Sequence, residues 1–324
     1  GLAQSQNKQK DQAIATLKSW LKENPEQAYT TWVEEYIHWL DKSLSETGER
    51  RYALLIGINA YQSTSLPKLR GCVNDVNRLI KPAIVQKLGF HERDVRVLTD
   101  KAATRKGVLE ELNSLKAETS PGDDLLVFFS GHSLPTGEPL IPGRNDLQTY
   151  LLLQDSIQDG QDFVNGLSAG ELHQYMMDIP AGQKTLILDT HASQVMVDLA
   201  ASQFEYNLIL ASDTAEVTYE NYIMIEGERL YCGLFSSGLY QSIIKEPDSE
   251  AITYSELMES ISSGMLEFSQ ANPNTRTQTP LFVGDRTQRV FGDYDPFWSM
   301  YQFSMRKNWA EYSVDNLKRE YLRL

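Results

Sequence analysis

The segment Asp124-Leu-Leu-Val-Phe-Phe129 is a short apolar run that leads directly into Ser130-Gly131-His132-Ser133. A run of this length, bounded by polar residues, is typical of a strand that is buried on both faces. Tyr52–Ile58 and Lys184–Asp189 have the same character, and segments with helical periodicity lie between these runs. Strands that alternate with helices predict an α/β fold, in which helices cover both faces of a mostly parallel sheet.

Shorter elements complete this alternating pattern on either side of the three runs. Strands are predicted at 95–98 and 206–211, and helices at 73–88, 106–118 and 169–177, with a further helix before 206. The segment from Ser133 to Gln161 lacks hydrophobic periodicity, so we predict one long loop there.

The two ends of the chain have a different pattern from the centre. Residues 1–48 show helical spacing with a break at Asn24-Pro25, which predicts two short helices resembling a single helical repeat. Residues 293–324 carry many aromatic side chains at roughly helical spacing, which predicts a helical tail. We therefore expect a central domain at 51–292 with a helical appendage at each end.

Composition limits the classes of partner and compartment. The chain has 324 residues, with 30 Lys and Arg against 44 Asp and Glu, and a net charge of −14. Phosphates would be repelled, so binding to nucleic acid or to an anionic membrane surface is disfavoured. Two cysteines, Cys72 and Cys232, cannot form a disulfide framework, which favours a reducing, cytoplasmic location. No apolar run of about 18 residues is present, so no membrane span is predicted.

Polar residues follow the apolar runs at the points where the predicted strands end. His132 follows one run, while Asp189 ends another and is followed by His191. Because the carboxyl ends of parallel strands lie at the same edge of a sheet, we expect both histidines and the carboxylate to converge there.

Six segments, in order along residues 51–292, resemble the caspase-like cysteine peptidases of the C14 type, closest to the bacterial orthocaspase and metacaspase group. They are Ala53–Asn59, Leu69–Val76, Phe129–His132, Leu186–Asp189, the set of Ala211, Ser212, Glu216, Glu220 and Gly233–Ser236, and Gln278–Pro280. The resemblance implies a three-layer caspase-like sandwich. It also implies cysteine endopeptidase ancestry, with cleavage of peptide bonds after Arg or Lys.

The resemblance also assigns roles to individual residues. His132 corresponds to the base of a His/Cys dyad, and Ser133 lies in the neighbourhood that binds the oxyanion. Asp75 and Asp189 correspond to the acidic residues that select a basic side chain. The family's cysteine motif reads Asp, any residue, Cys, His, Ser, Gly, and here His191 stands at the cysteine position.

Two explanations of the missing cysteine compete. We favour natural loss, which would make the chain a protein-binding or regulatory pseudoprotease, because positions 133, 191, 192 and 194 all depart from the family pattern. The alternative is a cysteine endopeptidase with Arg or Lys preference, seen as an inactive active-site mutant; a shift of one residue would then put Ala192 at the cysteine position. A third hypothesis is a helical-repeat scaffold that uses the central domain as a platform.

Plainer interpretations stand beside these roles. Asp75 would cap the helix that follows it, Asp189 would brace loop amides, and His191 would fill the vacated cysteine position. We expect no cofactor. The metal alternatives are zinc on His132 and His191 with Asp75 or Asp189, and calcium in the loop that contains Asp146, Asp155, Asp159 and Asp162. The expected partner is a protein or peptide with basic segments, bound by a monomer or by part of a larger multidomain chain.

Overall fold

The computed structural model describes most of the region between residues 50 and 290. The described residues are 15–19, 22, 50–121, 123–139, 147–159, 162–191, 194–203, 205–225, 227–245, 252–272, 275 and 278–290. Arg51–Asp293 form one compact unit, and Gly1–Arg50 with Tyr294–Leu324 form a second. The predicted helical repeat at 1–48, apart from a helical stretch at 15–19 and 22, and the predicted tail at 293–324 lie outside the described residues.

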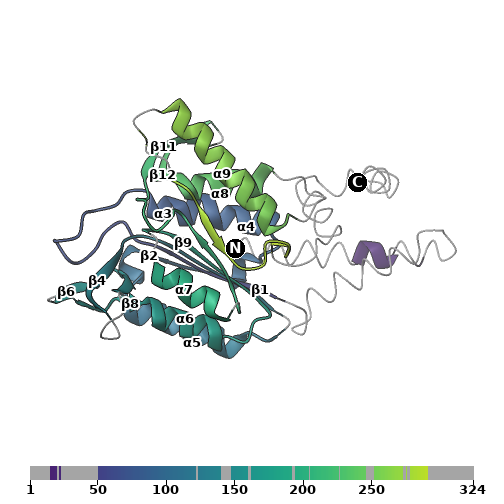
Figure 1. Ribbon diagram of the computed structural model, residues 1–324. Coiled ribbons are helices and arrows are strands. Elements are labelled where there is room, and N and C mark those ends of the chain that lie inside the picture. The colour runs from purple at the N-terminus through teal and green to yellow at the C-terminus, as the bar shows by residue number, and fades with distance from the viewer. Residues whose placement is uncertain are drawn as a thin grey trace. The chain divides into compact units, whose positions relative to one another are not determined.

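A six-stranded sheet forms the centre of the Arg51–Asp293 unit (Figure 1), in the strand order β13-β10-β9-β3-β1-β2. The strands are Leu281–Val283 (β13), Asn207–Leu210 (β10), Gln183–Asp189 (β9), Asp124–Ser130 (β3), Arg51–Gly57 (β1) and Val95–Thr99 (β2). Every neighbouring pair is parallel except β10 with β13, which is antiparallel. The mostly parallel sheet predicted from the apolar runs is therefore confirmed.

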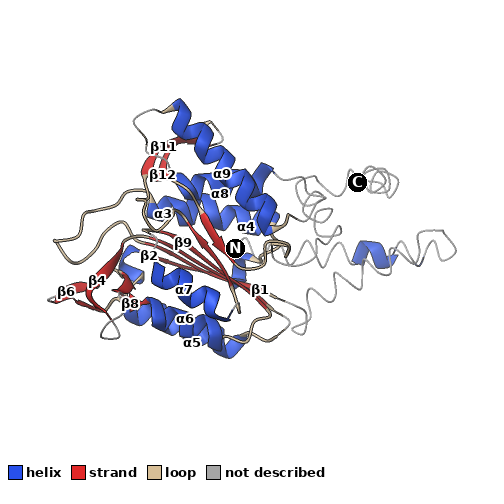
Figure 2. Cartoon of the chain, in the orientation of Figure 1, coloured by secondary structure: helices blue, strands red, loops and turns tan. Residues whose placement is uncertain are grey.

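Helices cover both faces of this sheet, so the red strands of Figure 2 lie between two layers of blue helices. One layer contains α3 (Cys72–Asn74), the π-helix η1 (Asp75–Ile80), α4 (Lys81–Lys87), α8 (Leu234–Lys245) and α9 (Tyr254–Ala271). The other contains α5 (Arg105–Glu118), α6 (Ala169–Asp178) and α7 (Gln194–Gln203). Short 3-10 turns, η2 (Glu92–Asp94) and η3 (Asp100–Ala102), flank β2. The predicted three-layer α/β architecture is confirmed.

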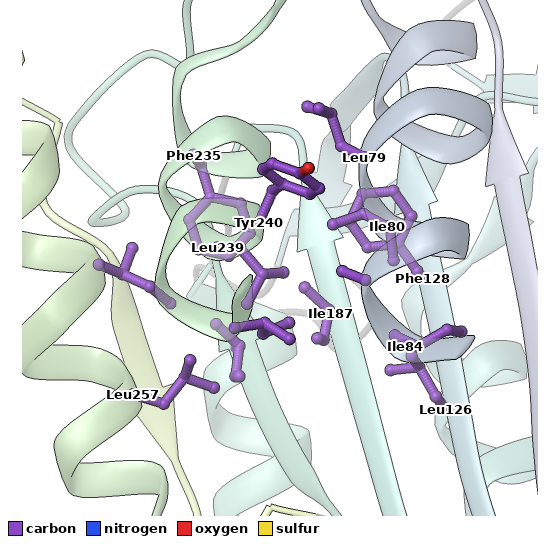
Figure 3. Close-up of a cluster of buried hydrophobic side chains, with 14 of the residues drawn as sticks. Leu79, Ile80, Ile84, Leu126, Phe128, Ile187, Phe235, Leu239, Tyr240 and Leu257 are labelled. Carbon is purple, nitrogen blue, oxygen red and sulfur yellow. The ribbon is translucent and has the colours of Figure 1, made fainter. Parts of the chain in front are cut away.

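Alternate residues of the central strands supply two separate hydrophobic cores. In β3, Phe128 lies in the core beneath α4 and α8, whereas Phe129 lies in the core beneath α5 and α6. Figure 3 shows the first core, where Phe128 and Ile187 from the sheet lie among side chains such as Ile80 and Leu239. Because one of the two layers covers each strand residue, the strands read as uninterrupted apolar runs rather than as alternating patterns.

The long loop predicted between Ser133 and Gln161 is wrong. Short strands occupy this region: β4 (Ser133–Pro139), β5 (Leu147–Leu151) and β6 (Ile157–Asp159), which pair with β8 (Leu167–Ser168) and β7 (Asp162–Val164) in two small antiparallel sheets. β5 and β6 span only five and three residues, and β4 contains Pro and Gly, which the sequence pattern assigns to turns, so these strands were missed.

A third small antiparallel sheet, the hairpin of β11 (Glu220–Ile225) and β12 (Glu228–Gly233), precedes α8. Its buried residues Ile223, Ile225 and Cys232 belong to the core beneath α4 and α8. Across the described part of the chain, no helix combines the length and apolar character that a membrane crossing requires.

Candidate functional site

Three neighbouring strands of the central sheet end at the same level. Gly57 pairs with Ser130, and Ser130 pairs with Asp189, so β1, β3 and β9 finish side by side. The residues that follow each strand therefore meet at one edge, as the spacing of polar residues in the sequence predicts. His132, Ser133, Asp189 and His191 all lie there.

His132 is held by two contacts from the loop that follows β1. Its backbone N–H donates to Tyr61 Oη at 2.7 Å, and the two rings lie 5.1 Å apart between centroids. Its Nε2 lies 2.8 Å from the carbonyl oxygen of Pro67. A carbonyl oxygen only accepts, so Nε2 carries the proton and Nδ1 is the basic nitrogen of the neutral ring. This arrangement suits a general base.

The loop that carries Tyr61 is itself anchored to the start of η3. Asp100 Oδ1 accepts the backbone N–H groups of Asn59 at 2.8 Å and Ala60 at 2.9 Å. Gly131 leaves room for the tyrosine, because a β-carbon at that position would lie 2.7 Å from Tyr61 Oη. Sequence reasoning assigned no role to Tyr61, although its position directly after the first apolar run is a signal that could have identified it.

His191 follows β9 and faces the same edge. Its carbonyl oxygen accepts a hydrogen bond from Ser133 Oγ at 2.8 Å, and its Nδ1 lies 3.4 Å from Thr218 Oγ1. Partial desolvation lowers the pKa of His191, and the charge of nearby His132 lowers it further. The two imidazoles are therefore within electrostatic reach of each other. Ala192, the alternative cysteine position, lies outside the described residues.

Asp75 and Asp189 converge on the backbone of Gly233. Asp75 accepts hydrogen bonds from Ser130 Oγ and from the backbone N–H of Gly233, each at 2.8 Å. Asp189 engages one oxygen, Oδ2, with the backbone N–H and hydroxyl of Ser236. A β-carbon on residue 233 would collide with Asp189 Oδ2 and lie 3.2 Å from Asp75 Oδ2. The two carboxylates predicted to act together are thus neighbours.

Burial is the main cause of the raised pKa values of these two carboxyl groups. Asp75 is 1% exposed and Asp189 is 6% exposed. Burial raises the pKa of Asp75 well above its usual range, and the charge of Asp189 raises it further. Burial also raises the pKa of Asp189, to about 6. The pair consequently holds protons to a higher pH than isolated carboxyl groups do.

The interpretation of Asp75 as a helix cap is wrong. Residue 75 lies inside a continuous helical stretch, where its own N–H already donates to the carbonyl of Gly71 at 2.8 Å. The amides that follow it have helical partners and need no side-chain cap. Its carboxylate points instead to Ser130 and Gly233. Asp189, by contrast, accepts the backbone N–H of Ser236, which lies within α8 rather than in a loop as expected.

Both cysteines are buried beside carboxylates. Burial raises the pKa of the Cys72 thiol well above its usual range, and it raises the pKa of Cys232 as well. Cys72 Sγ lies 3.6 Å from Glu220 Oε1, and that carboxylate also accepts the backbone N–H of Gly71 at 2.7 Å. A nucleophilic cysteine must be accessible and largely ionised, so neither thiol suits that role.

The metal alternatives find little support in the described ranges. No group of three or more His, Cys, Asp or Glu side chains is placed there to hold a metal ion. Asp155, one of the loop carboxylates, accepts the backbone N–H of Arg105 at 2.8 Å and so supports the start of α5. The absence of any cofactor remains a prediction.

Comparison with known proteins finds similar sequences for the part of the chain that contains these strands. Residues 51–200 match the model of the metacaspase, peptidase C14 domain family. Metacaspase-8 of Arabidopsis thaliana is 41% identical over 99 residues, which are 29% of this chain and 24% of that protein. Metacaspase-7 of the same plant is 34% identical over 157 residues, or 47% of this chain and 36% of that protein. Metacaspase-1 of Eremothecium gossypii is 37% identical over 92 residues, or 26% and 20%.

A solved structure agrees with the fold. The crystal structure of protein GSU0716 from Geobacter sulfurreducens aligns with a TM-score of 0.53 and 16% identity, over 75% of this chain and 98% of that chain. In the curated relatives, the matching stretches span from 20% to 36% of the length of each protein.

Proposed function

We propose that this chain, which carries a caspase-like domain of the metacaspase C14 type, acts as a pseudoprotease that binds basic protein segments without cutting them. The proposal rests on His191, which lies two residues beyond the end of β9, at the position where the resemblance to the family expects the nucleophilic cysteine. A cytoplasmic location suits a chain whose two described cysteines are buried and free.

Neither described thiol can replace the missing nucleophile. Cys72 is 3% exposed and Cys232 is 0% exposed, and burial raises the pKa of both. Acyl transfer in this family depends on a thiolate beside a base. A base without a thiolate supports recognition of a peptide but not hydrolysis.

The carboxylate pair provides the recognition element. Asp75 and Asp189 accept hydrogen bonds only from neutral donors among the described residues, and no described Lys or Arg forms an ion pair with them. Buried carboxylates without a cation are costly to ionise. A guanidinium or ammonium group from a partner would supply the missing charge and hydrogen bonds, which favours a basic side chain as the ligand.

Affinity for a basic peptide is expected to rise with pH. Burial raises the pKa of Asp189 to about 6, and the pKa of Asp75 is raised as well, so protons compete with the ligand in acid. A cationic side chain binds the pair when both carboxyl groups are ionised. Below the pKa of a carboxyl group, the proton on that group must be released before binding, which weakens binding by up to about tenfold per pH unit. We therefore expect weak binding near about pH 5 and an affinity that rises as the pH passes the Asp189 pKa of about 6.

Titration calorimetry tests this expectation with an Arg-containing peptide and its citrulline counterpart, which keeps the shape but removes the charge. The Arg peptide should bind at least about tenfold more tightly at neutral pH. The Asp189→Asn variant should lose most of the difference and the pH dependence. Equal affinity for the two peptides, or affinity that does not change with pH, would contradict the proposal.

One observation favours the alternative, a cysteine endopeptidase seen as an inactive mutant. His132 retains the tautomer and the supports of a working base, with Pro67 and Tyr61 fixing its ring and backbone. A cysteine codon at position 191 or 192 of the natural gene would establish this alternative. A histidine codon at 191 supports the pseudoprotease.

A further inference from the structure

The β11–β12 hairpin (Figure 1) has an exposed face, and its last residue, Gly233, contacts the carboxylate pair. By the alternation of antiparallel strands, Tyr222, Met224, Arg229 and Tyr231 share this face, and Arg70 lies against it. Tyr222 is 41% exposed and Met224 is 61% exposed, whereas Ile223, Ile225 and Cys232 on the opposite face are buried. We call these five residues the hairpin face.

Its two arginines are held in place by stacking on the tyrosines. The guanidinium carbon of Arg70 lies 4.3 Å from the ring centroid of Tyr231, and that of Arg229 lies 4.3 Å from the centroid of Tyr222. Arg70 Nη2 also donates to Tyr222 Oη at 2.9 Å. The two rings meet edge to face at 4.8 Å between centroids. Stacking of this kind orders a guanidinium but leaves most of its N–H donors available.

Neither of these arginines has a described carboxylate within ion-pair distance. Arg78 and Arg105, by contrast, pair with Glu228 and Glu171. The contrast is informative because the chain carries 44 acidic residues against 30 basic ones, so acidic partners are plentiful within it. Two ordered cations without an ion-pair partner among the described residues form a local positive site, beside the Glu220 carboxylate that accepts the Arg70 backbone N–H.

We propose that the hairpin face binds an acidic segment of a partner protein, with its carboxylates on Arg70 and Arg229 and an apolar side chain on Met224. Charge complementarity selects the acidic residues, and the stacked guanidinium groups bind carboxylates in the forked geometry that Arg favours. The exposed Met224 side chain supplies adaptable apolar contact beside them. A protein segment fits better than nucleic acid, because the net charge of −14 repels a continuous row of phosphates.

The hairpin also sets the spacing between this face and the carboxylate pair. Gly233 pairs with Glu220, Tyr231 with Tyr222, and Arg229 with Met224, so the pairs are two residues apart along each strand. These steps place the tyrosines about 7 Å and Arg229 about 13 Å from Gly233. An extended ligand with a basic residue at Asp75 and Asp189 would then carry its acidic residues two to four positions away; this spacing rests on the proposed function.

Fluorescence polarisation with three short labelled peptides tests the inference. The first is an acidic peptide of Asp and Glu with one Leu, and the second replaces its Asp and Glu with Asn and Gln. The third is the acidic peptide with one Arg added two to four positions from the acidic residues. The acidic peptide should bind at least about tenfold more tightly than the amide peptide and should weaken as salt is added. The double variant R70A/R229A should lose this difference. Arg286→Ala is the matched control, since Arg286 is an exposed arginine whose guanidinium carbon lies 5.6 Å from the Phe282 ring centroid.

The outcomes separate this inference from the proposed function. Equal binding of the acidic and amide peptides, unchanged binding by R70A/R229A, or tighter binding of a single-stranded oligonucleotide would overturn the acidic-segment site. Acidic-peptide binding that persists in the Asp189→Asn variant supports it, even if the Arg of the mixed peptide adds no affinity. If the added Arg brings no affinity, that result would count only against the binding of a basic side chain by Asp75 and Asp189.

Discussion

A His191→Cys variant is expected to acquire one highly reactive thiol that the parent chain lacks. The new thiol would follow β9 at an exposed position, within electrostatic reach of His132. A thiolate beside an imidazole is stabilised, so its fraction at neutral pH rises. Cys72 and Cys232 are buried with raised pKa values and should stay unreactive in the folded chain. Alkylation at residue 191 should exceed theirs by on the order of 10³-fold.

Timed alkylation followed by peptide mass spectrometry measures this difference at each cysteine. Asp213→Cys is the matched control, because it places an exposed thiol on a loop without the histidine. Adding His132→Ala to His191→Cys should return the rate to the level of that control. If the new thiol reacts no faster than the control thiol, or if loss of His132 leaves its rate unchanged, the site does not retain the geometry of a His/Cys dyad.

The second large effect is expected from Gly233→Ala. The added methyl group would meet Asp189 Oδ2 and lie 3.2 Å from Asp75 Oδ2, and both carboxylates are buried. Overpacking of a buried site costs about 1–3 kcal/mol, and displacement of Asp189 from Ser236 adds the loss of its hydrogen bonds. We expect the free energy of unfolding to fall by about 3 kcal/mol.

Urea denaturation of Gly233→Ala and of Gly264→Ala provides the measurement and its control. Gly264 lies within α9, and a β-carbon there would meet nothing within 4 Å. The same substitution at that helical site should stabilise the chain by about 0.5–1 kcal/mol. A Gly233→Ala chain as stable as its parent would show that the two carboxylates do not close on this glycine.

The sequence predicts the fold well because burial on both faces produces a simple pattern. The apolar runs at 52–58, 124–129 and 184–189 coincide with β1, β3 and β9, and the parallel arrangement follows from the helices between them. The same logic brings His132, Asp189 and His191 to one edge. These predictions depend only on local composition and chain direction.

Contacts between distant segments are not encoded in such local patterns. The hydrogen bond from His132 to Tyr61 and the approach of Gly233 to Asp189 join residues far apart in sequence. The periodicity of hydrophobic residues therefore does not predict these contacts. The π-helical stretch that contains Asp75 also differs from the capped helix start that a lone aspartate suggests. Among the strands after Ser133, β5 is brief and β4 contains Pro and Gly that read as turn residues, so neither gives a periodic signal.

The central claim is that the chain binds a basic segment and leaves it intact. The most direct measurement incubates the full chain with an unfolded, Arg- and Lys-rich protein, quantifies binding in pull-down, and examines every peptide bond by intact-mass and terminal-peptide mass spectrometry. The account predicts binding that Asp189→Asn weakens, with no cleavage above that of a His132→Ala control. Cleavage after Arg or Lys that disappears in His132→Ala would contradict it.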